Sequence, residues 1–543
     1  MTDGSDPMAP SGAVNPIDTD YKVGQDNIVL NVGPFGLDIH NRVFAISGLL
    51  VVAFVVLTLA FQNQVEPMFT AMRGWLTSNL DWFFISAGNI FVLVCLGLAI
   101  SPLGKVRLGG TEATPDYTYL GWFSMLFAAG MGIGLMFFGV SEPLSHFGSA
   151  FGGTAMENGV RTDWAPLGAA AGDAAAATRL GMAATIYHWA LHPWAIYAIL
   201  ALGLALFSFN KGLPLTVRSV FYPLLGERIW GWPGHVIDIL AVLATLFGLA
   251  TSLGYGAAQA SSGLNFLFDV PLGNTTQIVL VIGMTAIALF SVVAGLDAGV
   301  KRLSEINMML AVLLLVFVIA VGPTLDILSG FFGNLGAYFQ HLPALSNPVG
   351  RDDANFSQGW TAFYWAWWIS WSPFVGMFIA RVSRGRTVRE FIVSVLIVPS
   401  LACVLWMTVF GETAIIQFVR DGYEAATKAE LPLQLFAMLD ALPLAQITSF
   451  IAIILVVVFF VTSSDSGSLV IDVIAAGGKV DAPTPQRVFW CVFEGLVAIA
   501  LILGGGLVAL QAMAVSTGLP FTIVLLMSAV AVVKGLASEP RPR

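Results

Sequence analysis

The sequence predicts an all-α polytopic membrane protein with twelve spanning helices, and three observations carry this prediction. Hydrophobic residues make up 57% of the 543 residues and charged residues only 10%, whereas a soluble domain carries about 25% charged residues. Uncharged runs close to the ~20 residues that a helix needs to cross a bilayer recur along the whole chain. Basic residues are also distributed between the loops as the positive-inside rule requires.

The apolar runs define one transmembrane domain, which we expect at residues 43–533. A helix rises about 1.5 Å per residue, so each run matches a hydrocarbon core of ~30 Å. Bounds predicted in this way carry errors of a few residues. The expected spans are 43–61, 82–101, 119–139, 182–208, 234–256, 276–297, 303–329, 359–380, 390–417, 446–472, 488–507 and 511–533.

The basic residues predict that both termini are cytoplasmic. A wrong number of spans would place basic residues on both sides of the membrane without a preference. The observed preference for one side therefore supports twelve spans. Residues 1–42 are polar and acidic without an apolar run, so we expect a short, disordered cytoplasmic tail rather than a signal peptide, and residues 534–543 form a second cytoplasmic tail. With this topology 18 of the 24 Lys and Arg residues lie on the cytoplasmic side. The six on the external side are Arg73, Arg161, Arg179, Arg351, Arg420 and Lys428.

Composition and spacing exclude several classes of function. The net charge is −9 and no run of Lys and Arg is long enough to follow a phosphate backbone, so nucleic acid is not an expected partner. The three cysteines lie far apart in apolar runs without metal-ligand spacing. Neither a nucleophile–base pair nor a metal cluster is recognisable, so we expect that the protein is not an enzyme and uses no cofactor. The expected partner of its apolar surface is the lipid bilayer.

Two segments between the spans are predicted not to cross. Residues 140–181 are charged at their centre and Ala-rich near 169–177, which predicts an external loop with its own short helix, able to act as a lid. Residues 331–342 alternate aromatic and polar side chains over too short a length to cross, which predicts an interfacial helix.

Helix breakers in spans 3 and 8 predict how the spans are arranged. Span 3 holds the glycine-rich run 130–134, and span 8 holds Pro373. Such breaks survive at membrane depth where they line a cavity, although glycine runs also serve close helix packing. Because spans 3 and 8 are five helices apart, we predict two inverted repeats, spans 3–7 (about 119–329) and 8–12 (about 359–533), preceded by two extra helices, with a substrate site near the midplane.

Aromatic residues cluster beside these breaks. Trp367 and Trp371 share one face of span 8, and Trp368 lies about 100° away. Stacked aromatic faces attract a quaternary ammonium by about 0.5–2 kcal/mol each when water is excluded. The alternative is aromatic packing between helices. Span 4 adds Trp189, Trp194 and Tyr197.

The motifs around both breaks resemble the betaine/choline/carnitine transporter family. One motif runs from Phe127 through the glycine run to Gly139, Glu142 and Pro143, and the other from Trp365 to Pro373 and on to Arg386. The likeness covers nearly all twelve spans. It implies a leucine-transporter-type fold of five plus five inverted helices and a homotrimer in the bacterial inner membrane. It also implies sodium-driven uptake of a zwitterionic or cationic methylated solute, with glycine betaine the best fit.

The resemblance also implies roles for individual residues. The tryptophans of span 8 would form a central cage around the methylated cation. The aromatic residues of span 4, with Trp368, would form a box that the substrate meets on the way. The unwound part of span 3 would meet the substrate carboxylate. The implied substrate residues are Trp189, Trp194, Tyr197, Trp367, Trp368, Trp371, Met131, Gly132 and Gly134.

Two sodium sites are implied as well. Sodium is a hard cation that takes oxygen ligands, which a broken helix and nearby hydroxyls can supply, although Ser and Thr in membranes also bond to their own helix. The first site would use the carbonyls of Ala128, Met131 and Phe459 with the hydroxyls of Thr462 and Ser463. The second would use Thr245, Ser252 and Phe374. Leu249 stands where the family pattern has a hydroxyl, with Thr251 and Ser252 nearest, which leaves the sodium stoichiometry open.

Several alternatives stay open. Dimethylsulfoniopropionate, choline and ectoine compete with glycine betaine as the solute. The membrane acids Glu412, Asp465 and Glu494 would serve proton-coupled uptake, but span 5 has no Lys or Arg in a sodium position, which favours sodium. His188 and His192 have the i, i+4 spacing of a metal pair without a recognisable third ligand. A channel would be lined by polar rings rather than aromatic residues.

Overall fold

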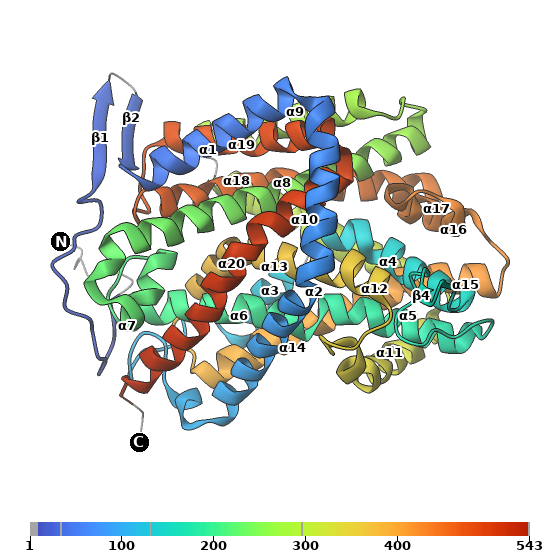
Figure 1. The fold of residues 1–543 in the computed structure, drawn as a ribbon, viewed down its shortest axis with the longest axis horizontal. Helices are drawn as coiled ribbons and strands as arrows, with labels where there is room; N and C mark the ends of the chain where they lie inside the picture. Colours follow the sequence, from blue (N-terminus) through green and yellow to red (C-terminus); the bar gives the residue numbers. More distant parts are fainter. Residues whose placement is uncertain (1–8, 33–34, 131, 295–296, 541–543) are drawn as a thin grey trace.

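The computed structural model describes residues 9–32, 35–130, 132–294 and 297–540. It is an α-helical bundle, elongated between an end that carries both termini and an opposite end that carries α12, α15 and α16 (Figure 1). The long helices are α1 (Val43–Ala60), α2 (Gln62–Ile100), α3 (Tyr119–Gly130), α4 (Ile133–Gly152), α5 (Ala174–Trp189), α6 (Leu191–Ala205), α8 (Trp232–Phe268), α9 (Asn274–Ala294), α10 (Asp297–Val321), α11 (Thr324–Leu345), α13 (Ala362–Val382), α14 (Val388–Met407), α18 (Ala445–Ala475), α19 (Thr484–Leu503) and α20 (Gly506–Ala537).

Short elements join these helices. The short helices are α7 (Tyr222–Leu225), α12 (Ala354–Phe356), α15 (Thr413–Val419), α16 (Ala425–Lys428) and α17 (Gln434–Asp440). Two antiparallel hairpins pair β1 (Asn27–Val32) with β2 (Phe35–His40) and β3 (Met156–Glu157) with β4 (Val160–Arg161).

Each predicted span falls on helical segments, although some of them, such as spans 3, 4 and 7, take in parts of two helices. The number twelve stays a prediction. Among the described residues, ten helical segments are long and apolar enough to cross a membrane, and eleven when α3 and α4, which meet at 63°, are taken as one broken span. The predicted eighth span, α13, has 21 residues but is too rich in Trp and Ser to join that set by mean hydropathy. Its residues are nearly all buried, as expected for a helix inside the bundle rather than against lipid.

The predicted break at Pro373 is wrong, because α13 runs through it without interruption. A proline inside a helix leaves the carbonyl four residues earlier without its amide partner. Here the hydroxyl of Ser372 donates to the carbonyl oxygen of Ile369 at 2.7 Å. The freed acceptor is therefore satisfied within the helix, which removes the need to unwind.

Two predicted loop bounds are also wrong. Residues 140–152 belong to α4, where most are buried, so the loop before α5 spans only residues 153–173 and holds the β3–β4 hairpin. The helix in the Ala-rich stretch 169–177 begins at Ala174. Its N-cap is Asp173, whose side chain accepts a hydrogen bond from the backbone amide of Ala176. Span 7 ends at Val321, and α11 already begins at Thr324, before the predicted interfacial helix.

The N-terminal tail is ordered where the structure describes it, contrary to the expected disorder. The amide of Ser11 donates to the carbonyl of Gly109 at 2.8 Å, and the amide of Ile17 to that of Lys211 at 3.0 Å. The β1–β2 hairpin is fixed by an ion pair between Asp38 and Lys479. These contacts join the tail to loops between the helices, which compensates for its polar composition.

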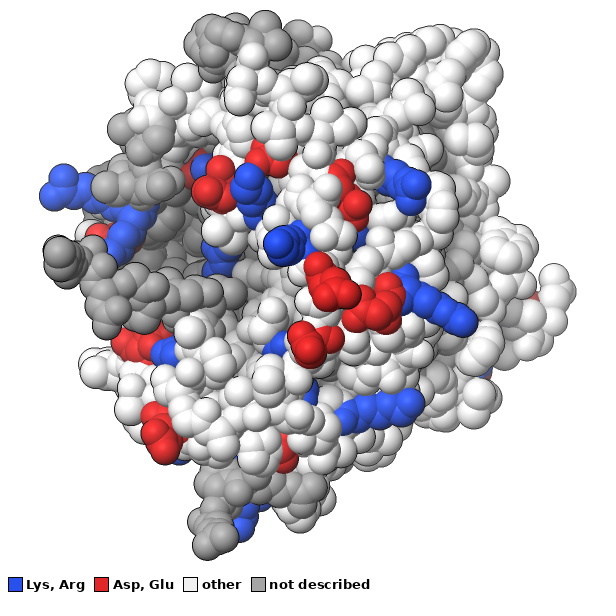
Figure 2. Space-filling model, turned by 90° about the vertical axis from the view of Figure 1, so that its left-hand side faces the viewer, with Lys and Arg blue, Asp and Glu red and all other residues white. Residues whose placement is uncertain are grey.

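The C-terminal tail is fixed at the same end of the molecule. Helix α20 extends beyond the predicted span to Ala537, and Glu539 is buried. Its carboxylate pairs with the ammonium of Lys211 at 2.5 Å and accepts from the amide of Asn210 at 3.0 Å. Figure 2 shows this end from outside, with Lys and Arg side chains interspersed with Asp and Glu.

The opposite end carries a loop that one arginine organises. Arg161 forms a two-pronged ion pair with Asp163, with an Nη2–Oδ1 distance of 2.6 Å, and donates to the carbonyls of Leu167 and Ala165. The hydrogen bonds from Arg161 lower the pKa of Asp163 from 3.8 to about 2. A carboxyl with a depressed folded pKa stabilises the loop above its unfolded pKa and loses that effect as the pH falls through the folded pKa.

We therefore predict that the loop opens in acid between about pH 4 and pH 2. The protection of residues 153–167 against hydrogen exchange, taken relative to the intrinsic rate at each pH, should fall over that window in the wild type. In Asp163→Asn the protection should already be low at neutral pH and should change little on acidification. Asp352→Asn is the matched control, because Asp352 also pairs with Arg161 but its side chain is 80% exposed and should matter little. Equal exchange in wild type and Asp163→Asn at pH 7 would contradict the prediction.

Candidate substrate site

Four of the predicted aromatic residues meet where α5, α6 and α13 pack together. Trp189 stands edge-on to Trp368 with ring centroids 4.9 Å apart, Tyr197 lies 6.3 Å from Trp368, and Trp194 lies 5.4 Å from Tyr197. All four side chains are at least nine-tenths buried. We call Trp189, Trp194, Tyr197 and Trp368 the aromatic box.

The other two predicted cage residues face a different helix. The indole N–H groups of Trp367 and Trp371 both donate to the carbonyl of Gly248 on α8, at 3.4 and 2.8 Å. This agrees with their shared face one helical turn apart. Trp367 is not one of the four box residues, but its ring stacks on that of Trp368 with centroids 4.9 Å apart. Trp371 packs against Phe374. Among the described ring contacts, Trp371 has none with Trp367 or Trp368.

The glycine run brings backbone close to the box. A Cβ atom at Gly134 would lie 2.8 Å from the Trp189 ring and 3.4 Å from the Trp367 ring, so only glycine fits between them. Gly132, by contrast, has open space around it and an extended backbone at the start of α4. The predicted substrate contact and sodium ligand Met131 lies outside the described residues.

Sequence reasoning missed the role of Glu142, which is fully buried behind the box. One carboxylate oxygen accepts from the indole of Trp189 at 2.7 Å and the hydroxyl of Tyr364 at 2.5 Å. The other lies 2.6 Å from a ring nitrogen of His188 and 3.1 Å from one of His146. The predicted end of span 3 at residue 139 had placed Glu142 in the external loop, so the rule that an ionisable side chain within a span is a functional candidate was not applied to it.

The residues of the first predicted sodium site lie on α3 and α18. Ala128 is half-buried on α3, and Phe459, Thr462 and Ser463 follow one another along α18. The hydroxyl of Thr462 lies within reach of the carbonyls of Val458 and Phe459, at 2.9 and 3.3 Å. That is back-bonding within the helix, so sodium coordination by Thr462 and Ser463 stays a prediction.

The hydroxyl groups of the second predicted sodium site lie against backbone carbonyls of packed helices. Thr245 donates to its own helix at Ala241, and Ser252 lies 3.4 Å from the carbonyl of Gly248. Thr251 lies between the carbonyls of Phe247 and Leu510 and so faces α20. Leu249 packs onto α18 at Gly467, where a Cβ atom would lie 2.3 Å from the leucine. Its side chain therefore fills an interhelical space.

The three membrane acids proposed for a proton relay each have a partner, and Asp465 and Glu494 lie near each other on neighbouring helices. Asp465 pairs with Arg487 at 2.8 Å, and Glu494 accepts from Ser464 at 2.9 Å. Glu412 accepts from Asn334 at 3.0 Å. Asp465 and Glu494 therefore lie between α18 and α19, whereas Glu412 lies beside α11.

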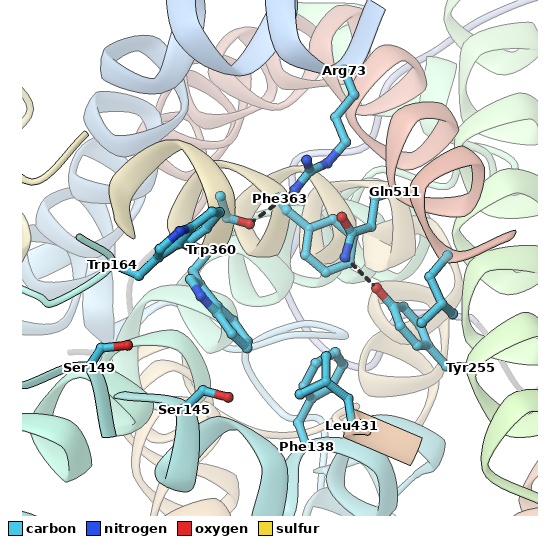
Figure 3. A pocket seen from close by; sticks show the side chains of 12 residues that line it. Arg73, Phe138, Ser145, Ser149, Trp164, Tyr255, Trp360, Phe363, Leu431 and Gln511 are labelled. Carbon is cyan, nitrogen blue, oxygen red and sulfur yellow. Dashed lines mark hydrogen bonds between the residues drawn. The ribbon is translucent and has the colours of Figure 1, made fainter. Parts of the chain in front are cut away.

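A cavity of about 390 Å³ is lined by residues of α2, α4, α8, α13 and α20 and of the loop before α5. Figure 3 shows Arg73 at one side, Trp164 and Trp360 at another, and Tyr255 hydrogen-bonded to Gln511. Its remaining lining includes Phe138, Ser145, Ser149 and Phe363.

This cavity adjoins the aromatic box, because Phe138, which lines it, has its ring centroid 6.2 Å from that of Trp189. Phe138 and Tyr255 line the cavity, and their rings lie 6.0 and 5.5 Å from Trp367. Arg73 donates to the carbonyl of Gly359 at 3.3 Å, while its buried Nε atom has no described partner. The cavity thus combines one guanidinium with several aromatic side chains.

Comparison with known proteins agrees with this architecture. The family model described as "BCCT, betaine/carnitine/choline family transporter" matches residues 42–541. A glycine betaine/proline/choline transporter of Vibrio parahaemolyticus is 74% identical, over 98% of this chain and 96% of its own length. Glycine betaine transporter 1 of the same organism is 54% identical over 96% and 97%, and a glycine betaine transporter of Acinetobacter baylyi is 40% identical over 92% and 74%.

These relatives are transporters and not enzymes, and their likeness extends over nearly the whole chain. A match of this extent establishes the family, as the motifs in the sequence indicated. The chain therefore belongs to the betaine/carnitine/choline family of membrane transporters.

Proposed function

We propose that this transporter imports glycine betaine by symport with sodium, through alternating access around the aromatic box. The observation that carries the proposal is the box itself, with four aromatic rings from three helices around a segment where only glycine fits. A methylated ammonium attracts such ring faces and makes no hydrogen bond that the site would have to satisfy. The names of the similar transporters of Vibrio support the same solute class.

The two ends of the substrate would meet different parts of the site. The trimethylammonium group would lie against Trp189, Trp368 and Trp367. The carboxylate would face the start of α4, where Gly132 leaves open space and the first amides of the helix lack intrahelical partners. We propose that the cavity lined by Arg73 is the external entrance and that both termini lie in the cytoplasm of a bacterial inner membrane, as the loop charges favour.

Sodium would bind between α3 and α18, with Ala128, Met131, Phe459, Thr462 and Ser463 as ligands. Helices that separate as the site opens to one side would break such a site, which couples ion binding to substrate binding. A homotrimer is part of the same proposal. The exposed ring and aliphatic side chains of α9 and α10, such as Phe290 and Met309, provide apolar surface for lipid or for a second copy.

Choline, dimethylsulfoniopropionate and ectoine are the alternative solutes, and proton-coupled uptake is the alternative mechanism. A specific observation supports choline, because the relative with 74% identity is named for proline and choline as well as glycine betaine. The box would accept any of the methylated cations, so the carboxylate contacts decide between them. Competition uptake with each solute in proteoliposomes tests the choice directly.

We predict that Trp368→Ala lowers the apparent affinity for glycine betaine by about 5–30-fold, equal to roughly 1–2 kcal/mol of lost cation–π attraction. Trp368→Tyr should lose less, because a ring face remains. The control is Trp490→Tyr, a buried tryptophan of α19 that packs on Phe44 and Phe489 away from the box. Initial uptake rates against substrate concentration provide the measurement, and equal losses for Ala and Tyr would favour a packing role.

We predict that Thr462→Val raises the sodium concentration for half-maximal uptake several-fold, with a smaller change in substrate affinity at saturating sodium. The substitution removes the hydroxyl and keeps the branched shape. Thr448→Val is the matched control, because Thr448 lies on the same helix and bonds only to its own backbone in the described contacts. Uptake driven equally well by a proton gradient without sodium would overturn sodium coupling and favour the membrane acids.

We predict that Arg73→Gln weakens uptake of glycine betaine more than uptake of choline, which has no carboxylate. A charge-assisted contact contributes about 1.5–3 kcal/mol, so the apparent affinity for glycine betaine should fall roughly 10-fold or more. Arg179→Gln, at an exposed arginine beyond the cavity lining, is the control. Equal losses for both solutes would show that Arg73 supports the cavity wall rather than recognising an anion.

A further inference from the structure

Three side chains of metal-ligand type converge behind the aromatic box. Glu142 Oε1, His146 Nε2 and His188 Nδ1 all lie within 4.8 Å of one another. The oxygen is 3.1 Å from the nitrogen of His146 and 2.6 Å from that of His188. Each of the three residues is at most 1% exposed, so the cluster is shielded from competing water.

The cluster differs from the pair that the spacing of the sequence suggested. His192 lies away from His188, stacked on Trp365 with its ring nitrogen 2.9 Å from the side-chain oxygen of Asn89. Glu142 and His146 instead share a face of α4 at i, i+4, and His188 approaches from α5. Two ligands at i, i+4 with a third from another helix is a common metal-binding arrangement.

Further hydrogen bonds hold these ligands in place. The second ring nitrogen of His188 lies 2.9 Å from the hydroxyl of Thr361. The second carboxylate oxygen of Glu142 accepts from Trp189 and Tyr364. Partners of this kind fix ring orientation and ligand basicity in metal sites, and their loss typically lowers metal affinity about 10–100-fold.

The chemistry of the donors selects the ion. Two imidazoles and one carboxylate suit a borderline divalent cation and fit a tetrahedral site with one further position. Ligand bonds of about 2.0–2.1 Å would place the donor atoms roughly 3.3 Å apart, so small rotations from the observed distances suffice. Binding would displace the protons that these groups share.

We propose that Glu142, His146 and His188 form a binding site for Zn²⁺ and that zinc inhibits transport by joining α4 to α5. The inhibition rests on the proposed transport function, whereas the binding itself does not. A metal on Glu142 would fix the carboxylate that holds the Trp189 indole, and Trp189 is one wall of the box. Zinc should therefore lower the maximal uptake rate rather than compete with the solute.

The external cavity provides the path for the ion. Ser145 and Ser149 line the cavity and flank His146 on the same helix. Trp360 also lines the cavity, and its ring centroid lies 4.7 Å from that of His146. In Figure 3 the Trp360 indole lies at the centre of the cavity view, on the side of Ser145. A rotation of this ring would open the way to the three ligands.

The first test is inhibition of glycine betaine uptake by zinc in proteoliposomes made without chelating buffer. We expect half-inhibition of the wild type at micromolar Zn²⁺, and roughly 10-fold or more zinc for the same effect in His146→Gln. His192→Gln is the control, because His192 neighbours the cluster in sequence but lies away from it. Equal inhibition of the wild type and His146→Gln would overturn the proposal.

The second test measures binding without transport, which protects the inference if a variant transports poorly. Purified wild-type protein should show the visible absorption bands of tetrahedral Co²⁺, and Zn²⁺ should bleach them. His146→Gln and His188→Gln should each weaken the bands, and His192→Gln should keep them. No bands with the wild type would overturn the site, whatever the outcome for transport. Absence of glycine betaine uptake with the bands intact would instead reject the proposed function alone.

Discussion

The fold around the substrate site depends on how one buried carboxylate is satisfied. Taking the carboxylate of Glu142 out of water costs several kcal/mol, which only close hydrogen bonds and charge partners can offset. Its four partners come from α4, α5 and α13. The requirement to satisfy Glu142 therefore fixes three helices of different repeats against one another and orients the Trp189 side chain. A polar network of this kind specifies geometry in a core where apolar packing alone allows alternatives.

The second constraint is that backbone N–H and C=O groups need hydrogen-bond partners within the protein, because lipid supplies none. The carbonyl of Gly248 accepts from two indole groups of α13, and the carbonyl that Pro373 frees on Ile369 accepts from Ser372. The N–H groups of Trp367 and Trp371 join α13 to α8, and the N–H group of Trp368 joins it to α5 through the carbonyl of His188. The rings of Trp367 and Trp368 stack on each other with centroids 4.9 Å apart.

Several features of the site could be predicted from sequence because they depend on spacing along one helix. The i, i+4 relation of Trp367 and Trp371 placed both on the face that meets α8, and the glycine run predicted backbone that approaches other groups closely. The predictions that failed depend on other segments. The spacing of His188 and His192 suggested a shared role, yet His192 turns to Asn89 while His188 meets Glu142, 46 residues away in the chain. The N-terminal tail looked disordered because its own residues bury little, but it forms its hydrogen bonds with distant loops.

The sequence by itself determined that this chain is a helical membrane transporter, where most of its apolar helices lie along the chain, and which family it belongs to. These properties follow from hydropathy and local motifs, since a bilayer imposes length and apolarity on every span separately. Only the tertiary structure decided that Trp371 lies apart from the box, that Leu249 fills a space against Gly467, and that Glu142 gathers two histidines, a tryptophan and a tyrosine. Such contacts arise from the relative rotation and depth of packed helices, which depend on all their neighbours at once and leave no periodic trace in the sequence.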